Sequence, residues 1–235
     1  MPTRFTGQTA LVTGGTGGLG RAVSLALLNE GARVVVTYRE QKEWIELQRA
    51  AAANATQLQG HNIDVTDAAA VDQFVARTVA ETGTLDVLVN AVGAYAGGTT
   101  LWESDPRVFE RMLALNLRSG YLLSRAVVPA MLKRGRGAIV NIASKAAIDH
   151  AAGAAAYVAS KAAAVAMIDS LAADLQGTGV RVNSVLPSII DTEANRKAMP
   201  NADFSKWPKP EEIATVILFL CSDDAKLIHG ASVPV

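Results

Sequence analysis

The segment SKAAIDHAAGAAAYVASK, residues 144–161, carries Ser144, Tyr157 and Lys161 among many alanines. Tyr157 and Lys161 are four residues apart, so a helix would place both side chains on one face. A phenol has a pKa of about 10 in water, too high for easy proton exchange at neutral pH. A nearby ammonium group stabilises the phenolate and lowers that pKa, so the pair could act as a general acid or base.

Ser144 could add a second group at the same place. It follows the apolar run GAIVNIA and is expected in the loop after a strand. Its hydroxyl could hydrogen-bond a substrate oxygen on which negative charge develops. A tyrosine and a lysine four apart are also common on ordinary helix surfaces, so the rest of the sequence must decide between the two interpretations.

A glycine-rich loop, TGGTGGLG at residues 13–20, lies between the apolar run ALV and the helical pattern RAVSLALL. Glycines let the backbone turn sharply and let a pyrophosphate approach closely, while the N-terminus of the helix supplies free N–H donors. A glycine-rich loop can also be a plain turn. Its position between a strand and a helix favours a dinucleotide-binding loop.

The end of the second predicted strand bears on the choice of cofactor. An acidic residue there would bind the ribose hydroxyls and repel a 2′-phosphate. The run VVVTYRE instead places Tyr38 and Arg39 there, and a guanidinium can bind a phosphate with two hydrogen bonds. The sequence therefore favours NADP(H). NAD(H) stays possible, because Glu40 follows directly and Arg39 could simply be solvated.

Short β-branched runs, among them HNIDVTD at 61–67, alternate with longer helical patterns along the whole chain. The helical patterns include an alanine-rich one that extends to about residue 55 and long ones at about 104–133 and 155–176. The strand-like runs are continuously apolar, which indicates strands covered on both faces, as in a parallel sheet flanked by helices. We therefore predict an α/β fold with a doubly wound parallel sheet. No linker or internal repeat divides the chain, so residues 1–235 are expected to form a single domain.

Composition narrows the classes of partner. The 235 residues include 22 Lys and Arg and 22 Asp and Glu, so no basic excess points to nucleic acid or an anionic membrane. The single cysteine, Cys221, can form no intrachain disulfide, and the three histidines are scattered, so no metal site is expected. The chain shows no signal-peptide pattern and no uninterrupted apolar run of about 20 residues. We expect a soluble, cytoplasmic protein with a small-molecule substrate.

Taken together, the motifs resemble those of the short-chain dehydrogenase/reductase family, and among them the 3-oxoacyl and carbonyl reductases. The resemblance runs from about residue 8 to the C-terminus and rests on TGGTGGLG, NAVG at 90–93, Asn116 in ALNLRSG, Ser144, Tyr157, Lys161 and LPSIIDT at 186–192. It implies a Rossmann-like fold and hydride transfer between C4 of a nicotinamide and a carbonyl carbon. It also implies a homotetramer or homodimer built on the two long helical segments.

The same resemblance implies residue roles. Tyr157 would be the catalytic acid or base, Ser144 would polarise the substrate oxygen, and Lys161 would hold the nicotinamide ribose. Asn116 would hold a water that relays protons. Asp64 and Val65 would bind the adenine and Asn90 the adenosine ribose, while Ile189 and Thr192 would bind the carboxamide. The complete set expected to bind the cofactor is Gly14, Thr16, Gly18, Leu19, Gly20, Tyr38, Arg39, Asp64, Val65, Asn90, Ala91, Gly93, Tyr157, Lys161, Pro187, Ile189 and Thr192.

The segment expected to cover the substrate, about 188–210, is shorter than in many family members. Its stretch DTEANRKAMPNADFSKW, residues 191–207, locally resembles dihydropteridine reductases. Two interpretations stay open. Met199, Phe204 and Trp207 could pin a short lid to the core, or a flat heteroaromatic substrate could stack nearby. Tyr95, His150 and Met199 are the candidate substrate contacts.

The leading interpretation is an NAD(P)-dependent oxidoreductase acting on a ketone or secondary alcohol, similar to 3-oxoacyl reductases. A pterin reductase is the alternative within enzymes. A protein that only senses NADP(H) is the alternative outside them. Such a sensor would need the glycine loop but not Ser144, Tyr157, Lys161 and Asn116 together, and all four are present.

Overall fold

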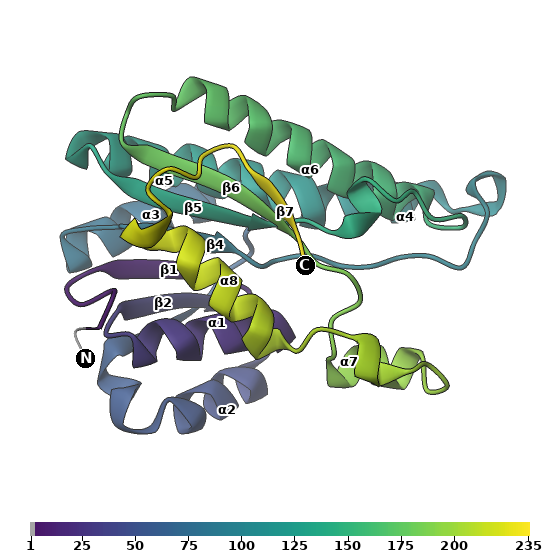
Figure 1. The fold of residues 1–235 in the computed structure, drawn as a ribbon, viewed down its shortest axis with the longest axis horizontal. Coiled ribbons are helices and arrows are strands. Elements are labelled where there is room, and N and C mark those ends of the chain that lie inside the picture. Colours follow the sequence, from purple (N-terminus) through teal and green to yellow (C-terminus); the bar gives the residue numbers. More distant parts are fainter. Residues whose placement is uncertain (1–2) are drawn as a thin grey trace.

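The computed structural model describes residues 3–235 and contains one sheet of seven parallel strands (Figure 1). The strands are β1 (Thr9–Thr13), β2 (Arg33–Tyr38), β3 (Leu58–Asn62), β4 (Val87–Asn90), β5 (Gly137–Ile142), β6 (Val180–Leu186) and β7 (Ser232–Pro234). Their order in the sheet is β3-β2-β1-β4-β5-β6-β7. The direction of winding reverses between β1 and β4, and ligands bind outside the carboxyl ends of strands at such a point.

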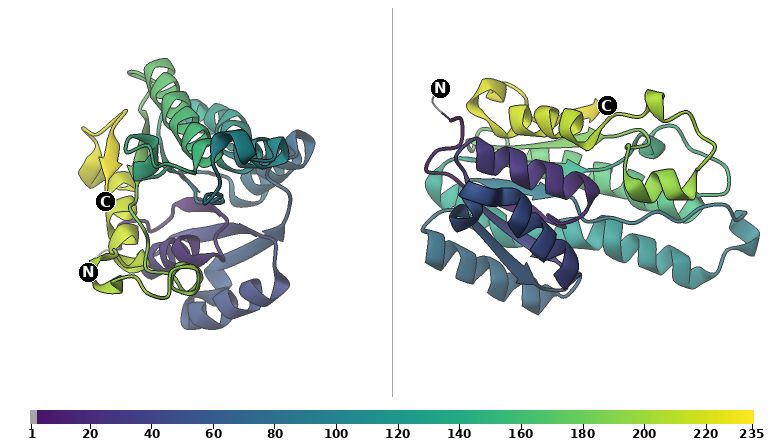
Figure 2. Two further views of the ribbon diagram at one scale, coloured as in Figure 1. Left: turned by 90° about the vertical axis from the view of Figure 1, so that its right-hand side faces the viewer. Right: turned by 90° about the horizontal axis from the view of Figure 1, so that it is seen from below.

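Helices connect the strands and cover both faces of the sheet. The helices are α1 (Gly18–Asn29), α2 (Gln41–Ala51), α3 (Ala68–Thr82), α4 (Pro106–Leu113), α5 (Ser119–Arg134), α6 (Ala155–Asp174), α7 (Glu193–Ala198) and α8 (Pro210–Cys221). One layer holds α1, α2 and α8, and the other holds α3, α5 and α6 with α4 beside α6 (Figures 1 and 2). This arrangement confirms the predicted doubly wound α/β fold in one domain.

The core consists of two apolar layers, one on each side of the sheet. Alternate residues of β1 show why both layers form: Ala10 and Val12 pack beneath α1 and α8, whereas Leu11 packs beneath α3 and α5. All three side chains are fully buried. Strands that bury both faces need continuous apolar sequence, which explains the runs seen in the chain.

The long helix expected at about 104–133 is divided. After α4 the backbone forms a π-helical turn, Ala114–Arg118, before α5 begins at Ser119. Such turns widen a helix locally and often occur at functional sites. The turn contains Asn116, whose buried side chain leaves the helix toward the end of β4.

Two further boundaries differ from the predicted ones. The helix expected to continue to about residue 55 ends at Ala51, because Ala52 takes a positive φ of 45°, and a 3-10 segment, Ala52–Gln57, follows. The third strand is Leu58–Asn62 rather than HNIDVTD, since the Asp64 carboxylate accepts hydrogen bonds from the backbone and hydroxyl of Thr66 and closes a turn. The short helix α7 was not predicted.

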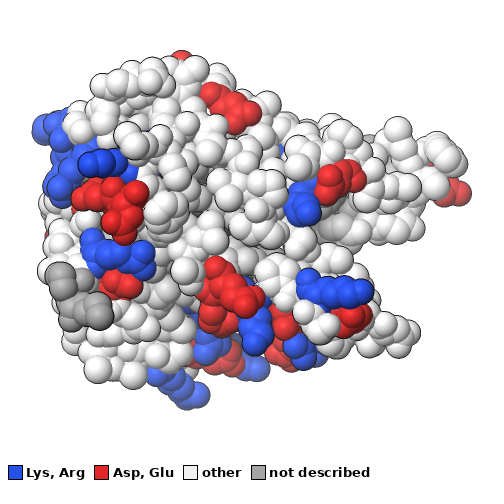
Figure 3. Space-filling view, in the orientation of Figure 1, with Lys and Arg blue, Asp and Glu red and all other residues white. Residues whose placement is uncertain are grey.

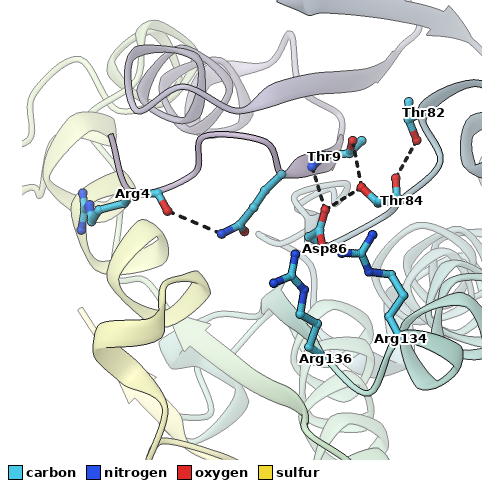
Figure 4. A network of polar contacts seen from close by, with 8 residues as sticks. Arg4, Thr9, Thr82, Thr84, Asp86, Arg134 and Arg136 are labelled. Atoms are coloured by element: carbon cyan, nitrogen blue, oxygen red, sulfur yellow. Dashed lines mark hydrogen bonds and ion pairs between the residues drawn. The ribbon is translucent and has the colours of Figure 1, made fainter. Parts of the chain in front are cut away.

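The amino ends of the strands are joined by a polar network around Asp86 (Figure 4). This side chain is 4 % exposed and accepts hydrogen bonds from the backbone N–H of Thr9 at 2.9 Å and from the Thr84 hydroxyl at 2.8 Å. Arg134 and Arg136 form ion pairs with it at 3.6 and 3.3 Å. The network connects β1, β4 and the end of α5 at the edge of the sheet opposite the glycine-rich loop.

By length and composition alone, α6 is the one helix in the described part of the chain that could cross a membrane. Its most apolar window has a mean hydropathy of 1.3, and 28 % of that window is buried. The helix packs on β6 and α4, with Ser160 and Lys161 on its buried side. Much of its small, apolar surface therefore faces outward.

Candidate active site

The predicted catalytic residues come together at the carboxyl ends of β4, β5 and β6. Ser144 follows β5, Asn116 lies in the π-helical turn, and Tyr157 and Lys161 occupy the first two turns of α6. A notch opens at this edge of the molecule, with the α4 region on one side and α7 on the other (Figure 3).

Lys161 is held by a single hydrogen bond inside the protein. Its Nζ donates to the carbonyl oxygen of Ile142 at 2.8 Å, and its side chain is 5 % exposed. Burial lowers the pKa of Lys161 to about 8, because a charged ammonium is poorly solvated there. Gly93 leaves the space that this side chain needs, since a Cβ at Gly93 would lie 3.2 Å from Nζ. At mildly alkaline pH the Lys161 amine is therefore about half protonated.

Tyr157 is half-buried, and its pKa is raised above the ordinary value. The main cause is burial, an interaction with the Ser144 side chain lowers the pKa in part, and Tyr95 raises it slightly. This differs from the expectation that Lys161 lowers the pKa of Tyr157. The Lys161 ammonium is directed to Ile142, and desolvation of the phenolate outweighs the stabilising contacts.

Asn116 links the end of β4 to α6. Its Oδ1 accepts from the backbone N–H of Ala94 at 2.8 Å, and its Nδ2 donates to the Ala94 carbonyl and to the Ser160 hydroxyl at 3.0 and 2.9 Å. A Cβ at Gly93 would lie 3.0 Å from that Oδ1. These contacts hold the amide in one orientation beside Lys161.

Two other side chains approach the tyrosine. Ser144 caps a short 3-10 turn, Lys145–Ala147, and its Oγ accepts from the backbone N–H of Ala146 at 3.2 Å, which leaves its O–H free to donate. Tyr95, after β4, stands edge-on to the Tyr157 ring with centroids 5.0 Å apart and is 70 % exposed. Of the other candidate substrate contacts, His150 is exposed in the loop after β5 and Met199 is half-buried at the end of α7.

The glycine-rich loop forms a narrow cradle at the N-terminus of α1. Gly14 has a φ of +63°, which favours glycine, and a Cβ at Gly20 would overlap the carbonyl oxygen of Gly14. The loop is tied to β2 because the backbone N–H of Gly14 donates to the Thr37 hydroxyl at 3.0 Å. α1 begins without a side-chain cap, so its first N–H groups are free for an anion. These features fit a dinucleotide pyrophosphate.

The end of the site where the sequence predicts adenosine binding contains mixed charges. Arg39, at the end of β2, lies 3.8 Å from the Asp64 carboxylate, and burial of both is slight. The Tyr38 ring stacks on Trp44 of α2, with centroids 5.4 Å apart. Glu43, which the sequence motifs did not indicate, accepts a hydrogen bond from the Thr16 hydroxyl at 2.8 Å. This contact depends on how α2 packs against the glycine-rich loop, which the sequence alone does not show.

Other residues expected to bind the cofactor line the same edge. The Asn90 side chain is committed within the sheet, since its Oδ1 accepts from Thr13 at 2.7 Å and its Nδ2 donates to Asn141 at 3.0 Å. The structure therefore holds this side chain between β1 and β5. Leu19 and Val65 are buried at the start of α1 and after β3, and Ala91 is half-buried next to Gly14.

The segment after β6 folds back over the glycine-rich loop. Thr192 caps α7, and its Cγ2 would lie 2.8 Å from a Cβ at Gly18, so the two segments are in close contact. The Pro187 carbonyl accepts from the backbone N–H of Lys145 at 2.9 Å, and Ile189 is 44 % exposed. The segment thus borders the loop at one end and the notch at the other.

The aromatic residues of this segment do not reach the core. Phe204 and Trp207 pack on each other with centroids 4.9 Å apart, and the Arg196 guanidinium lies 4.8 Å from the centre of the Phe204 ring. Arg196 also pairs with Asp191. Neither aromatic residue nor Met199 belongs to the two core layers, so the expected pinning to the core is replaced by a local cluster.

Comparisons with known proteins agree with this geometry. Residues 8–203 match the family described as short chain dehydrogenase. The chain is 36 % identical to D-threitol dehydrogenase of Mycolicibacterium smegmatis, covering 97 % of this chain and 91 % of that protein. It is 31 % identical to a 3-oxoacyl-(acyl-carrier-protein) reductase of Thermotoga maritima, covering 97 % and 95 %. A crystal structure of a short-chain dehydrogenase/reductase from Burkholderia xenovorans superposes with a TM-score of 0.90 at 32 % identity, covering 99 % and 96 %.

The chain belongs to the short-chain dehydrogenase/reductase family. It is accordingly an oxidoreductase that acts on CH–OH groups or the corresponding carbonyls with a nicotinamide cofactor, NAD(H) or NADP(H). Within residues 3–235, no group of three or more His, Cys, Asp or Glu side chains is placed to hold a metal ion.

Proposed function

We propose that the protein interconverts a ketone and a secondary alcohol, with Tyr157 as the general acid or base and a 3-oxoacyl compound or a related small ketone as substrate. The observation that carries the proposal is the convergence of Tyr157, Ser144 and Lys161 beside the glycine-rich loop. Ser144 keeps its O–H free to donate, and the Tyr157 phenol interacts with the Ser144 side chain. Lys161 is held in one orientation by its hydrogen bond to Ile142.

The reaction balances with the residues in these roles. A nicotinamide cofactor, when bound, would provide the hydride for reduction of the carbonyl carbon and would take it up in the reverse direction. Ser144 donates a hydrogen bond to the carbonyl oxygen, on which negative charge develops. Tyr157 passes its phenolic proton to that oxygen, and the raised pKa of Tyr157 keeps the phenol protonated for reduction. Lys161, through a water that Asn116 would hold, would then return a proton to Tyr157 from solvent.

The cofactor would be held by this chain's own residues along the carboxyl edge of the sheet. Gly14, Gly18 and Gly20 would receive the pyrophosphate in the cradle described above, with Thr16 and Leu19 at its rim. Arg39 favours NADP(H), because its exposed guanidinium can turn from Asp64 to a 2′-phosphate. Ile189 and Thr192 would contact the carboxamide, and Thr192 already lies against the loop.

The walls of the notch favour a substrate with an apolar portion. Tyr95, Ile148 and Ile189 follow β4, β5 and β6, respectively, and are 70 %, 52 % and 44 % exposed. One relative, 33 % identical over 99 % of this chain and 94 % of that protein, is named meso-2,3-butanediol dehydrogenase of Serratia marcescens, and 2,3-butanediol is a small secondary alcohol. A pterin reductase stays the second candidate, favoured by the local resemblance at residues 191–207.

The protein is proposed to work in the cytoplasm as a homotetramer or homodimer, without nucleic acid or membrane partners. The oligomeric part of this proposal is supported by the outward surface of α6 and by a groove of about 430 Å3 beside it, lined by Glu110, Leu113, Ala114, Leu117, Arg118, Tyr121 and Met167. Light scattering during size-exclusion chromatography measures the mass. A chain that runs only as a 24.6 kDa monomer at micromolar concentration would contradict this part of the proposal.

The function is tested by following oxidation of NADPH and NADH with acetoacetyl thioesters, diketones, sugars and quinonoid dihydropterin. Ketone turnover that is lost in Tyr157→Phe, while NADPH binding is retained, is the expected result. Turnover of the pterin alone would replace the ketone reductase by the pterin reductase. Cofactor binding with no turnover of any compound would instead favour an NADP(H)-sensing protein.

A further inference from the structure

A half-buried carboxylate lies at the corner where β2 meets the glycine-rich loop. Glu43, in the first turn of α2, accepts the hydrogen bond from the Thr16 hydroxyl at 2.8 Å. Thr16 is 7 % exposed. The carboxylate is therefore held against the loop to which the proposed function assigns the cofactor's phosphates.

Neighbouring contacts fix the orientation of Glu43. Glu46, three residues later on α2, lies 3.8 Å from the Arg21 guanidinium of α1, so this face of α2 is turned toward α1 and its preceding loop. The loop itself is tied to the carboxyl end of β2 through Thr37. Glu43, Thr16 and the carboxyl end of β2 consequently form one corner of the site.

This corner is where dinucleotide-binding folds distinguish the two nicotinamide cofactors. An acidic residue binds the ribose hydroxyls of NAD(H), and an arginine accommodates the 2′-phosphate of NADP(H). Both types are present here. Arg39 is 65 % exposed and already close to Asp64, whereas Glu43 is half-buried and fixed. A fixed, partly buried charge interacts more strongly with a ligand than a mobile, solvated one.

We propose that Glu43 is a cofactor-specificity residue that opposes Arg39. Its carboxylate accepts hydrogen bonds from the ribose hydroxyls of NAD(H) and repels the 2′-phosphate of NADP(H). This inference rests on the proposed function, because it concerns the cofactor of the same site. It implies that the native chain uses both cofactors, with a preference for NADP(H) smaller than Arg39 alone would give.

The test measures binding of the adenosine halves of the two cofactors without any reaction. Titration calorimetry gives Kd for adenosine 2′,5′-bisphosphate and for 5′-AMP with the native protein, Glu43→Gln and Glu46→Gln. In Glu43→Gln the bisphosphate should gain about tenfold in affinity relative to 5′-AMP, the size expected from one like charge in a partly exposed site. Glu46→Gln removes the same charge from the same helix without touching the loop, and its ratio should stay within about twofold of native.

The possible results separate the proposals. An unchanged ratio in Glu43→Gln, or an equal change in both variants, would overturn the role of Glu43. Glutamine keeps an acceptor for Thr16, and Glu43→Asp, which withdraws the charge from the loop, provides a second measurement with a smaller shift in the same direction. A shifted ratio without turnover of any substrate would support Glu43 while overturning the proposed reaction. Failure to bind either nucleotide would overturn both.

Discussion

At the scale of single residues, Lys161 combines a charge with almost complete burial. Its one hydrogen bond, to Ile142, does not compensate for the lost solvation, and its pKa falls to about 8. The pKa of an unfolded lysine stays near 10.5. Between these two values the unfolded chain binds more protons than the folded chain, so the free energy of unfolding rises with pH across this range.

Lys161→Met should remove the part of the pH-dependent rise in the free energy of unfolding that Lys161 contributes. With the native protein, Lys161 should contribute an increase of up to about 3 kcal/mol in the free energy of unfolding between pH 8 and 10.5. Urea unfolding at several pH values from about 7 to 10 measures the difference between native and variant. The raised pKa of Cys221, about 12, and the raised pKa of Tyr157 act in the opposite direction above about pH 9. Because they do so in both proteins, the difference between native protein and variant isolates Lys161.

Lys133→Met is the control, since Lys133 is exposed in the last turn of α5. Its unfolding free energy should follow the native pH dependence. Parallel curves for native protein and Lys161→Met would show that the buried lysine does not titrate in this range, against the prediction.

Tyr95 should influence catalysis through Tyr157. The edge-on contact helps to bury the phenol, and both burial and Tyr95 raise its pKa. In Tyr95→Ala the alkaline limb of the pH profile for reduction should move to lower pH, because the phenol loses its proton more easily. Trp102→Ala removes an aromatic side chain that is 83 % exposed and should leave the limb in place. An unmoved or raised limb in Tyr95→Ala would refute this role.

The site residues differ in how far the sequence could predict them. The proximity of Tyr157, Lys161 and Ser144 was predictable because helical spacing and strand ends place them together regardless of detailed packing. Glu43 was not, since its contact with Thr16 depends on how α2 rotates against α1. The raised pKa of Tyr157 was missed for a similar reason: it depends on burial and on where the Lys161 amine points.

At the scale of elements, the structure departs from ideal helices where side chains need special directions. The π-helical turn lets Asn116 reach Ala94 while α4 and α5 keep their packing. No simple periodicity marks such a turn, because one extra residue changes the pattern only locally. The regular strands and long helices were predictable from apolar periodicity, whereas these local irregularities were not.

The end of α2 offers a test of backbone strain. Ala52 has φ 45° and ψ −117°, a conformation that suits glycine and costs about 1 to 3 kcal/mol for other residues. Ala52→Gly should therefore raise the free energy of unfolding by about 1 kcal/mol after the greater flexibility of unfolded glycine is subtracted. Thermal unfolding should show a Tm increase of about 2 to 4 °C.

Ala53→Gly provides the comparison, because Ala53 lies in the following 3-10 segment and has no positive φ. It should lower the Tm, since the glycine gains nothing in the folded state. A lower Tm for Ala52→Gly as well would contradict the strain at this position.

At the scale of the whole molecule, the parallel sheet separates stability from chemistry. All strands point the same way, so their carboxyl ends form the site and their amino ends are free for structural contacts. The Asp86 network occupies the amino ends of β1 and β4 (Figure 4). A change there should alter folding stability without altering the geometry of the notch.

Asp86→Ala should test this separation. It leaves the buried N–H of Thr9 without an acceptor and two arginines without their carboxylate, which should cost about 2 to 4 kcal/mol. Asp72→Ala breaks an exposed ion pair with Arg125 and should cost less than about 1 kcal/mol. At a temperature where both variants are folded, KM for cofactor and substrate should equal the native values. A changed KM in Asp86→Ala, or equal destabilisation by the two variants, would mean that the two ends of the sheet are coupled.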